Sequence, residues 1–294
     1  MPVKHGTIII TGARGQLGSE LKNRSQEFGF NMIFTDLPEL DLTDKDSTGK
    51  FIGEHQPEFV INCAAYTAVD KAETEKDKAR LINVTAVDNL ATICNRLGST
   101  LIHISTDFVF PGNTASPLTE EDRTDPVNYY GLTKLEGEKI ALKLCEKTLV
   151  VRTSWLYSSY GNNFVKSMLR IAQDRDEINV VFDQAGTPTY AYDLADSILK
   201  ILSGIGDGTF NIEKVKGIYH YSNEGVASWY DFTRSIFEMR NISLKVNPIL
   251  SSGYPTAARR PAFSVLDKSK IKQAFGIEIP YWKDSLAKCL SIME

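Results

Sequence analysis

The sequence has few of the residues that build metal clusters and disulfide frameworks. Its four cysteines, Cys63, Cys94, Cys145 and Cys289, lie far apart and form no Cys-x-x-Cys pair. The four histidines show no spacing that is typical of metal ligands. A disulfide framework is therefore not expected, no metal site is predicted, and a reducing, cytoplasmic environment fits the chain.

Long apolar runs and clusters of basic residues are also missing. No apolar run approaches the roughly 20 residues that a membrane-spanning helix needs, and the N-terminus lacks a signal-peptide pattern. The net charge is -4, with lysine and arginine scattered along the chain. Neither a membrane nor a nucleic acid is therefore an expected partner.

The first half of the 294 residues alternates short β-rich runs with amphipathic ones. Strands are expected at 7–12, 31–36, 57–65, 99–106 and 147–155, and helices at 16–29, 77–98 and 128–145. Alternation with short joins predicts an α/β fold with a doubly wound parallel sheet of the Rossmann type. Gly29 and Gly98 stand where a left-handed helix C-cap belongs.

The second half is less regular. Helices are expected at 162–174 and 228–241, between loops rich in proline, glycine and serine. The pattern predicts a dinucleotide-binding domain over 1–155. A smaller, interwoven lobe over 156–294 is expected mainly to bind substrate, with some segments returning to the sheet.

A glycine-rich turn follows the first expected strand. In "TGARGQLG" the glycines fall at 12, 15 and 18. Gly12 permits the tight turn, Gly15 lets the backbone approach a pyrophosphate, and Gly18 lets the helix pack close to the strand. The helix N-terminus, with Gln16 and Leu17, then offers free N–H groups to the anion. This arrangement predicts a nucleotide cofactor.

Two residues near this turn favour different cofactors. Asp36 ends the second expected strand, where a carboxylate accepts hydrogen bonds from the adenosine ribose and repels a 2′-phosphate, as suits NADH. Arg14 lies in the glycine turn and could pair with that phosphate, as suits NADPH. Asp41 and Leu42 are candidates for the adenine pocket, although Thr43 or Asp44 equally suits a helix N-cap.

A hydroxyl, a phenol and an ammonium follow at the other end of this half. Thr106 ends the fourth expected strand, and Tyr130 and Lys134 are four apart on one helix face. A nearby ammonium is expected to lower the pKa of the phenol, so that Tyr130 acts as a general acid near neutral pH. Thr106 would hydrogen-bond the substrate oxygen, and Lys134 could hold the nicotinamide ribose.

These features resemble the extended short-chain dehydrogenase/reductase superfamily. Longer blocks also resemble the dTDP-4-dehydrorhamnose reductase family along nearly the whole chain: "VINCAAYTAVDKAE", "STDFVF", "RTSWLY", "NNFVKSMLR", "DQAGTPTYAYDLA" and "ARRPAFSVLD". The resemblance implies that NADPH or NADH reduces the 4-keto group of dTDP-6-deoxy-L-lyxo-4-hexulose, giving dTDP-L-rhamnose for surface polysaccharide.

The resemblance also implies roles for individual residues. Ala64, Ala65, Tyr66 and Thr67 would line the cofactor cleft. The substrate side would comprise Val69, Thr106, Asp107, Trp155, Arg259 and Arg260. Members of that family differ in whether Mg²⁺ supports a dimer; the sequence offers no ligand set, so no metal is carried over, while a homodimer is compatible. Where the family usually has Asp-Gly after "STDFVF", this chain has Pro111-Gly112.

Several alternatives stay open on the residues alone. Trp155 also suits a core aromatic, and either Arg259 or Arg260 could meet a diphosphate. A nucleotide-sugar 4-epimerase or another nucleotide-sugar reductase would use the same residues. A dehydratase would need a proton-transferring group where Phe108 stands. A non-enzymatic regulatory subunit of methionine adenosyltransferase shares this fold, but the intact Thr106, Tyr130 and Lys134 argue against it.

Overall fold

A parallel sheet of six strands forms the centre of the computed structural model, which describes residues 6–293. The strand order is β10-β5-β4-β3-β1-β2, and every neighbouring pair is parallel. The strands are β1 (Thr7–Thr11), β2 (Asn31–Thr35), β3 (Phe59–Asn62), β4 (Thr100–Thr106), β5 (Thr148–Thr153) and β10 (Gly217–His220). The predicted α/β fold class is therefore confirmed, and β10 supplies a strand from the second half.

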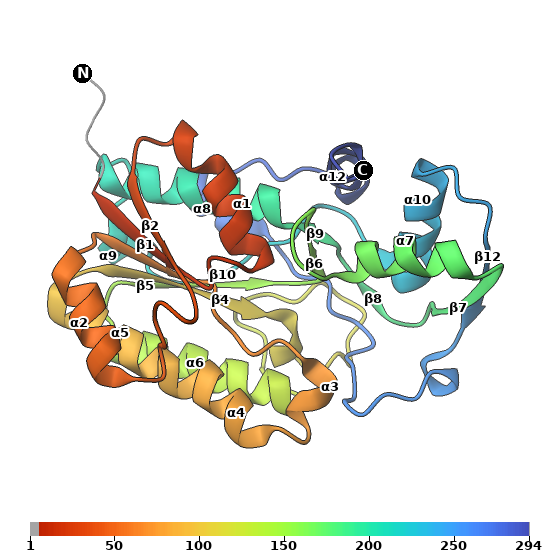
Figure 1. Cartoon of the computed structure of the whole chain (residues 1–294), viewed down its shortest axis with the longest axis horizontal. Helices are drawn as coiled ribbons and strands as arrows, with labels where there is room; N and C mark the ends of the chain where they lie inside the picture. The colour runs from red at the N-terminus through yellow and green to blue at the C-terminus, as the bar shows by residue number, and fades with distance from the viewer. Residues whose placement is uncertain (1–5, 294) are drawn as a thin grey trace.

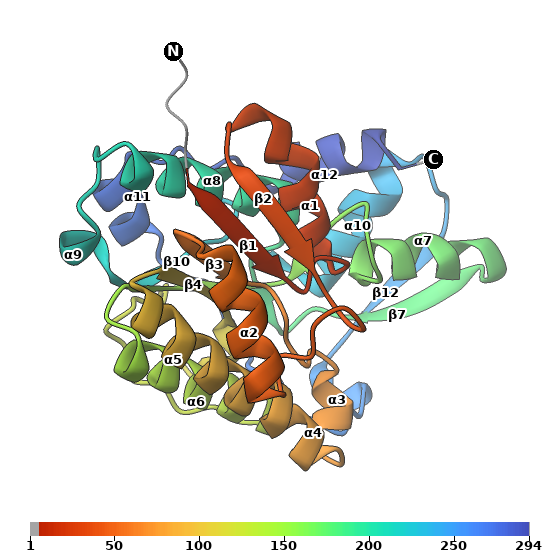
Figure 2. The same ribbon diagram turned by 60° about the vertical axis from the view of Figure 1, so that its left-hand side comes forward.

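Helices cover both faces of this sheet, as Figures 1 and 2 show. One face packs on α1 (Gln16–Arg24) and α8 (Ala191–Gly206) through a buried apolar cluster. The other packs on α2 (Lys45–His55), α5 (Ala86–Leu97) and α6 (Tyr129–Leu144). Because both faces are covered, β1 and β3 each contain a continuous run of three apolar residues rather than an alternating pattern.

Two of the expected helices differ in detail. The helix predicted over 16–29 ends at Arg24, where the Ser25 hydroxyl donates to Lys22 O at 2.7 Å and the chain tightens into η1 (Ser25–Glu27). The helix predicted over 77–98 begins as α4 (Lys76–Arg80) and passes through the π-helical segment η2 (Leu81–Thr85) before α5. As predicted, Gly98 is the left-handed C-cap, with φ 73°.

The second half of the chain builds a further apolar cluster with short two-stranded sheets. The expected helices are confirmed as α7 (Phe164–Asp174) and α10 (Trp229–Met239). The pairs are β6 (Leu156–Tyr157) with β9 (Thr189–Tyr190), β7 (Glu177–Val181) with β12 (Lys245–Ile249), and β8 (Ala185–Gly186) with β11 (Ala227–Ser228). The remaining elements are α3 (Val69–Ala72), η3 (Asp107–Val109), α9 (Ile212–Val215), η4 (Ser251–Gly253), α11 (Ser269–Phe275) and α12 (Trp282–Ser291). In the part of the chain that is described, no helix is long and apolar enough to cross a membrane.

A buried ion pair fastens α6 to the sheet. Arg152 of β5 donates to both carboxylate oxygens of Glu138, at 2.9 and 2.7 Å, and both side chains are almost fully buried. Ser105 of β4 also donates to Glu138. Two parallel charge-assisted bonds fix orientation as well as distance. The helix that carries Tyr130 and Lys134 is thereby held in one rotational setting against β4 and β5.

Two glycines let α6 approach its neighbours closely. A Cβ at Gly131 would lie 2.2 Å from Phe108 O, and a Cβ at Gly137 would lie 2.3 Å from Asn83 O. Both contacts are with backbone atoms, which cannot turn aside as a flexible side chain can. The start of α6 therefore lies directly against η3, next to the end of β4.

Replacing Gly131 with alanine tests this close approach. At an exposed helix position, replacing glycine with alanine raises the free energy of unfolding by about 0.5–1 kcal/mol. At Gly131 the same replacement should instead lower the free energy of unfolding by about 1–3 kcal/mol, because the backbone must move to make room for the Cβ. Gly53 of α2 is the matched control, since a Cβ there meets nothing within 4 Å. Chemical unfolding should show Gly53→Ala more stable and Gly131→Ala less stable than wild type; a stabilised Gly131→Ala would contradict the contact.

Candidate active site

The glycine turn is shaped by close backbone contacts. Gly12 has φ +65°, and a Cβ there would lie 2.6 Å from Ala64 N. A Cβ at Gly18 would lie 2.5 Å from Gly12 O, whereas at Gly15 the nearest such contact is 3.2 Å. The turn therefore rests on the end of β3, and α1 starts immediately after it. Gly15, the N-cap of α1, is exposed.

A pocket with a volume of about 250 Å³ opens beside this turn. It brings together residues from the ends of β1, β2 and β3 and from the start of α5. First-turn amides of α1 have no acceptor within the helix, so they suit an anion at this edge. The pocket thus fits the adenosine and phosphate part of a dinucleotide. Its lining includes these residues predicted for the cofactor: Gly12, Gly15, Asp36, Asp41, Leu42, Ala64 and Ala65.

Other residues predicted for the cofactor lie elsewhere. Leu17 is 4% exposed and belongs to the core beneath α1. The Gln16 side chain bridges to the second half of the chain: its Oε1 accepts from Asn163 Nδ2 at 3.0 Å. Leu17 can therefore offer only its backbone N–H group to a cofactor, while the Gln16 side-chain oxygen is already bonded to the second half of the chain. Thr67 is exposed outside this pocket.

Asn83 is a buried side chain that connects two parts of the site, and the sequence did not predict this role. From the π-helical segment it accepts from Tyr66 N at 2.9 Å, and its amide donates to Tyr66 O at 3.2 Å and to Thr133 Oγ1 at 3.0 Å. It thereby ties the chain around Tyr66 to α6. The π-helical turn is what brings the Asn83 amide to these partners, and the hydrophobic periodicity of the sequence does not predict a π-helical turn.

Asp36 and Arg14 meet at the rim of the pocket. The Asp36 carboxylate accepts from Arg14 N at 2.9 Å and from Leu37 N at 2.8 Å. The Arg14 guanidinium is exposed and bonded to Leu37 O and to the Glu39 carboxylate. Asp36, the expected ribose acceptor, and the Arg14 cation therefore lie at one edge of the pocket, and Glu39 is the counter-ion of Arg14.

The phenol and the hydroxyl come together at the carboxyl end of the sheet. Thr106 is the last residue of β4, and Tyr130 lies in the first turn of α6, which Asn128 caps by accepting from Gly131 N at 2.8 Å. The Thr106 hydroxyl lies close enough to the Tyr130 phenol to lower its pKa. Phe108 packs edge-on against the Tyr130 ring, with 5.7 Å between ring centroids. Thr106 and Tyr130 therefore share one buried corner.

The pKa of Tyr130 differs from the expectation. Burial raises it to about 12, which outweighs the lowering effect of the Thr106 hydrogen bond, and the Asp107 charge raises it further. Lys134 is not among the groups that shift this pKa, and its ammonium donates to Ile104 O at 2.7 Å rather than to the phenol. Burial in turn lowers the pKa of Lys134 to about 8, against the raising effect of the Glu138 charge. The phenol is therefore fully protonated at neutral pH.

Asp107 is a second acid in this corner. It is 2% exposed, and its Oδ1 accepts from Thr106 Oγ1 at 3.0 Å. Burial raises its pKa to about 6, although hydrogen bonds from Ser264 and Thr106 oppose the rise. Asp107 thus lies between the Thr106 hydroxyl and a serine from the second half of the chain.

Trp155 lies where the two halves of the chain meet. It has φ 45°, and its indole stacks on Trp229 with 3.5 Å between centroids and 5° between planes. A Cβ at Gly186 would lie 2.6 Å from the same indole. Trp155 is partly buried and packs at the margin of the apolar cluster of the second half of the chain.

The two neighbouring arginines have different surroundings. Arg260 forms a bidentate pair with Asp70 of α3, whereas Arg259 is exposed. Val69 is partly buried beside Tyr66 and Tyr130.

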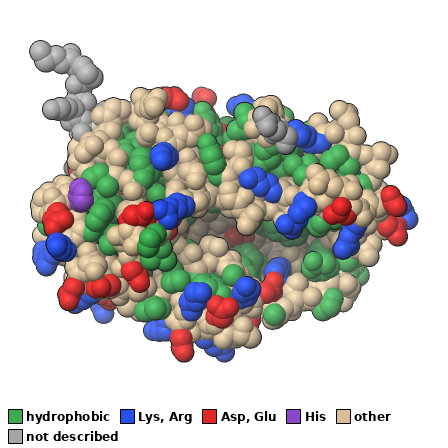
Figure 3. Space-filling model, in the orientation of Figure 1, with side chains coloured by type: hydrophobic (Ala, Val, Ile, Leu, Met, Phe, Trp, Pro, Cys, Tyr) green, Lys and Arg blue, Asp and Glu red, His purple; other side chains and the backbone are tan. Residues whose placement is uncertain are grey.

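Within residues 6–293, no group of three or more His, Cys, Asp or Glu side chains is placed to hold a metal ion. The molecular surface is hollowed near the middle of the face drawn in Figure 3.

Six parallel strands in this order, a glycine-rich first turn and a Tyr-x-x-x-Lys helix define a Rossmann-type oxidoreductase of the short-chain dehydrogenase/reductase class. The family model described as the RmlD substrate binding domain matches residues 6–294, and the chain belongs to this family.

Named relatives cover nearly the whole chain. A dTDP-4-dehydrorhamnose reductase from Aggregatibacter actinomycetemcomitans is 44% identical over 95% of this chain and 96% of its own. A solved dTDP-4-dehydrorhamnose reductase from Clostridium acetobutylicum is 41% identical with TM-score 0.92, covering 97% and 99%. The one from Bacillus anthracis, solved in complex with NADP, is 36% identical with TM-score 0.92, covering 98% and 99%. The resemblance seen in the sequence is thereby confirmed.

Cofactor titrations of two variants test the rim of the pocket. Arg14→Ala should weaken NADPH more than NADH, because only NADPH carries the 2′-phosphate. Glu39→Gln should do the opposite and strengthen NADPH relative to NADH, because it removes the counter-ion of Arg14. Fluorescence titration gives the Kd of each variant and of the wild type for NADPH and for NADH, which is four values for each comparison. Equal effects on the two cofactors in both variants would show that Arg14 does not contact the phosphate.

Proposed function

We propose that this protein reduces the 4-keto group of dTDP-6-deoxy-L-lyxo-4-hexulose to dTDP-L-rhamnose with NADPH or NADH. The observation that carries the proposal is the buried corner in which Thr106, Tyr130 and Lys134 gather at the carboxyl edge of the sheet. The relatives named above carry the same activity in their names. Thr106, Tyr130 and Lys134 are the proposed catalytic residues.

The bound cofactor would supply a hydride, and thus two electrons, to the carbonyl carbon, and would leave oxidised. As the new C–H bond forms, the π electrons of the C=O bond move to the oxygen, which needs a proton. Tyr130 donates that proton, and the Thr106 hydroxyl stabilises the developing charge by hydrogen bonding. A pKa of about 12 for Tyr130 still suits this role, because an alkoxide is more basic than a phenolate.

The substrate side of the proposal rests on residues from both halves of the chain. Val69, Asp107 and Trp155 would contact the sugar. Of the two arginines, Arg259 is the better candidate for the diphosphate, because Arg260 is already paired with Asp70. We divide the chain into a cofactor domain over 1–155 and a substrate lobe over 156–294. A cytoplasmic location and a homodimer remain predictions.

Replacing the proposed acid tests the chemistry. Tyr130→Phe should lower turnover of the dTDP-4-keto sugar by roughly 10²–10⁴, the usual contribution of a positioned acid, with NADPH affinity unchanged. Tyr129→Phe is the matched control, because the Tyr129 ring lies beside the Lys76 ammonium and, among the described residues, no hydrogen bond joins its phenol to Thr106. It should stay within about threefold of wild type. Turnover is followed by NADPH absorbance; a nearly active Tyr130→Phe would remove Tyr130 from the mechanism.

The dependence of the rate on pH tests Lys134. Its pKa of about 8 means that the ammonium is present below that pH and is lost as the pH rises. The kcat/KM for NADPH, which reports groups of the free enzyme, should therefore fall above pH of about 8. Glu138→Gln removes the charge that raises the Lys134 pKa, so this fall should begin at lower pH. A fall at the same pH in both proteins would contradict the assignment.

A further inference from the structure

A segment of the second half of the chain, residues 256–267, crosses the loops that surround the proposed catalytic corner; we call it the strap. Ala258 N donates to Asp70 Oδ1 at 3.0 Å, and Leu118 N donates to Val265 O at 2.9 Å. A Cβ at Gly112 would lie 2.4 Å from Pro261. The strap therefore touches α3 and the chain that follows η3.

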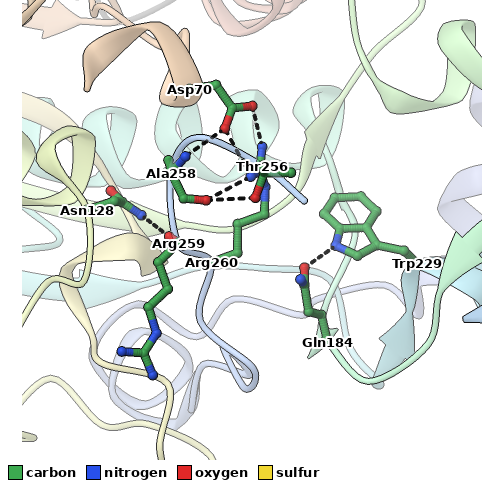
Figure 4. Close-up of polar contacts among 8 residues, drawn as sticks. All are labelled: Asp70, Asn128, Gln184, Trp229, Thr256, Ala258, Arg259 and Arg260. Atoms are coloured by element: carbon green, nitrogen blue, oxygen red, sulfur yellow. Dashed lines mark hydrogen bonds and ion pairs between the residues drawn. The ribbon is translucent and has the colours of Figure 1, made fainter. Parts of the chain in front are cut away.

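The carboxylate of Asp70 organises the first part of the strap, as Figure 4 shows. Arg260 donates to both of its oxygens, Nη1 to Oδ1 at 3.2 Å and Nη2 to Oδ2 at 2.7 Å, and Nη1 also donates to Ala258 O at 3.1 Å. The hydrogen bond from Arg260, aided by that from Ala258 N, lowers the pKa of Asp70. Asp70 is therefore ionised at neutral pH and its oxygens are occupied by the strap.

Arg259, the next residue, is turned the other way. Figure 4 shows its side chain pointing away from Asp70 and Arg260. Among the residues that the structure describes, none is bonded to its guanidinium, and the residue is exposed. Pairing of Arg260 with Asp70 thus leaves one cation of the two free for an anionic ligand.

The strap also reaches the start of the catalytic helix. Asn128 Nδ2 donates to Arg259 O at 2.8 Å, while Asn128 Oδ1 accepts from Gly131 N at 2.8 Å as the N-cap of α6. One amide side chain therefore joins the strap to the helical turn that carries Tyr130. A shift of the strap would move both Arg259 and this cap.

We infer that Asp70 is a positioning residue for the proposed reduction. Its carboxylate holds the strap in the position in which the Arg259 side chain is free to bind the diphosphate and the Arg259 carbonyl accepts the hydrogen bond from Asn128, the N-cap of α6. This role rests on the proposed function and adds a group that touches neither the reacting atoms nor the cofactor pocket. The pocket beside the glycine turn contains no residue of α3 or of the strap in its lining.

Asp70→Asn tests the role, because asparagine keeps the size of the side chain and removes the charge that binds Arg260. Binding of dTDP, measured by calorimetry, should weaken about tenfold, the scale of one charge-assisted interaction. The KM for the sugar should rise and kcat should fall, while the Kd for NADPH stays unchanged. The matched control is Glu177→Gln, which breaks the exposed Glu177–Lys245 pair in the second half and should alter none of these values.

Double variants separate positioning from a loss of general stability. If Asp70 acts through Arg259, the loss of dTDP affinity should be absent when Asp70→Asn is added to Arg259→Ala. If it acts through Asn128, the loss in kcat should be absent in an Asn128→Ser background, where serine still caps α6 but its shorter side chain lacks the amide that donates to Arg259 O. Additive effects in both backgrounds would overturn the inference.

The opposite result for dTDP is also informative. If Arg260 were the diphosphate ligand, Asp70→Asn would release it, and dTDP would bind as well as or better than in wild type; either result overturns the inference. The dTDP titration does not require turnover. A wild-type protein that binds dTDP but does not reduce the keto sugar would contradict the proposed function and leave the Asp70 result to be judged separately.

Discussion

The close approach of α6 to the end of β4 is the constraint on which the site depends. It requires that Gly131 and Gly137 lack a side chain, because backbone oxygens of Phe108 and Asn83 occupy the space. The buried Glu138–Arg152 pair then fixes the rotation of the helix. From this packing follow the meeting of Thr106 with Tyr130 and the bond from Lys134 to Ile104 O.

Much of the architecture could be predicted from local patterns. The strands near residues 8, 32, 60, 102 and 150 are confirmed because buried parallel strands are continuous apolar runs. The need for glycine at 12 and 18 also follows from the turn between β1 and α1. The early end of α1 and the π-helical segment were missed, since each depends on contacts that are distant in the sequence. The return of part of the second half to the sheet was expected, but the strand that makes it, β10 at the sheet edge, was not located.

The electrostatics of the site could not be predicted from spacing alone. Tyr-x-x-x-Lys places two groups on one helix face, but it does not say that Ile104 O receives the ammonium or that burial dominates both pKa values. Likewise the sequence left Arg259 and Arg260 equivalent, and only the fold brings Asp70 to one of them. Charge in a folded protein depends on burial and partners, which a linear pattern does not contain.

The central claim is that Tyr130 and its neighbours support a net reduction of the sugar and not a reversible hydride exchange. The most direct measurement uses NADPH that carries deuterium at the transferred position, with the dTDP-4-keto sugar as acceptor. Mass spectrometry and NMR should find one deuterium at C4 of the deoxysugar for each cofactor oxidised. No net oxidation of the cofactor in the presence of the keto sugar, or a product without deuterium at C4, would contradict the account.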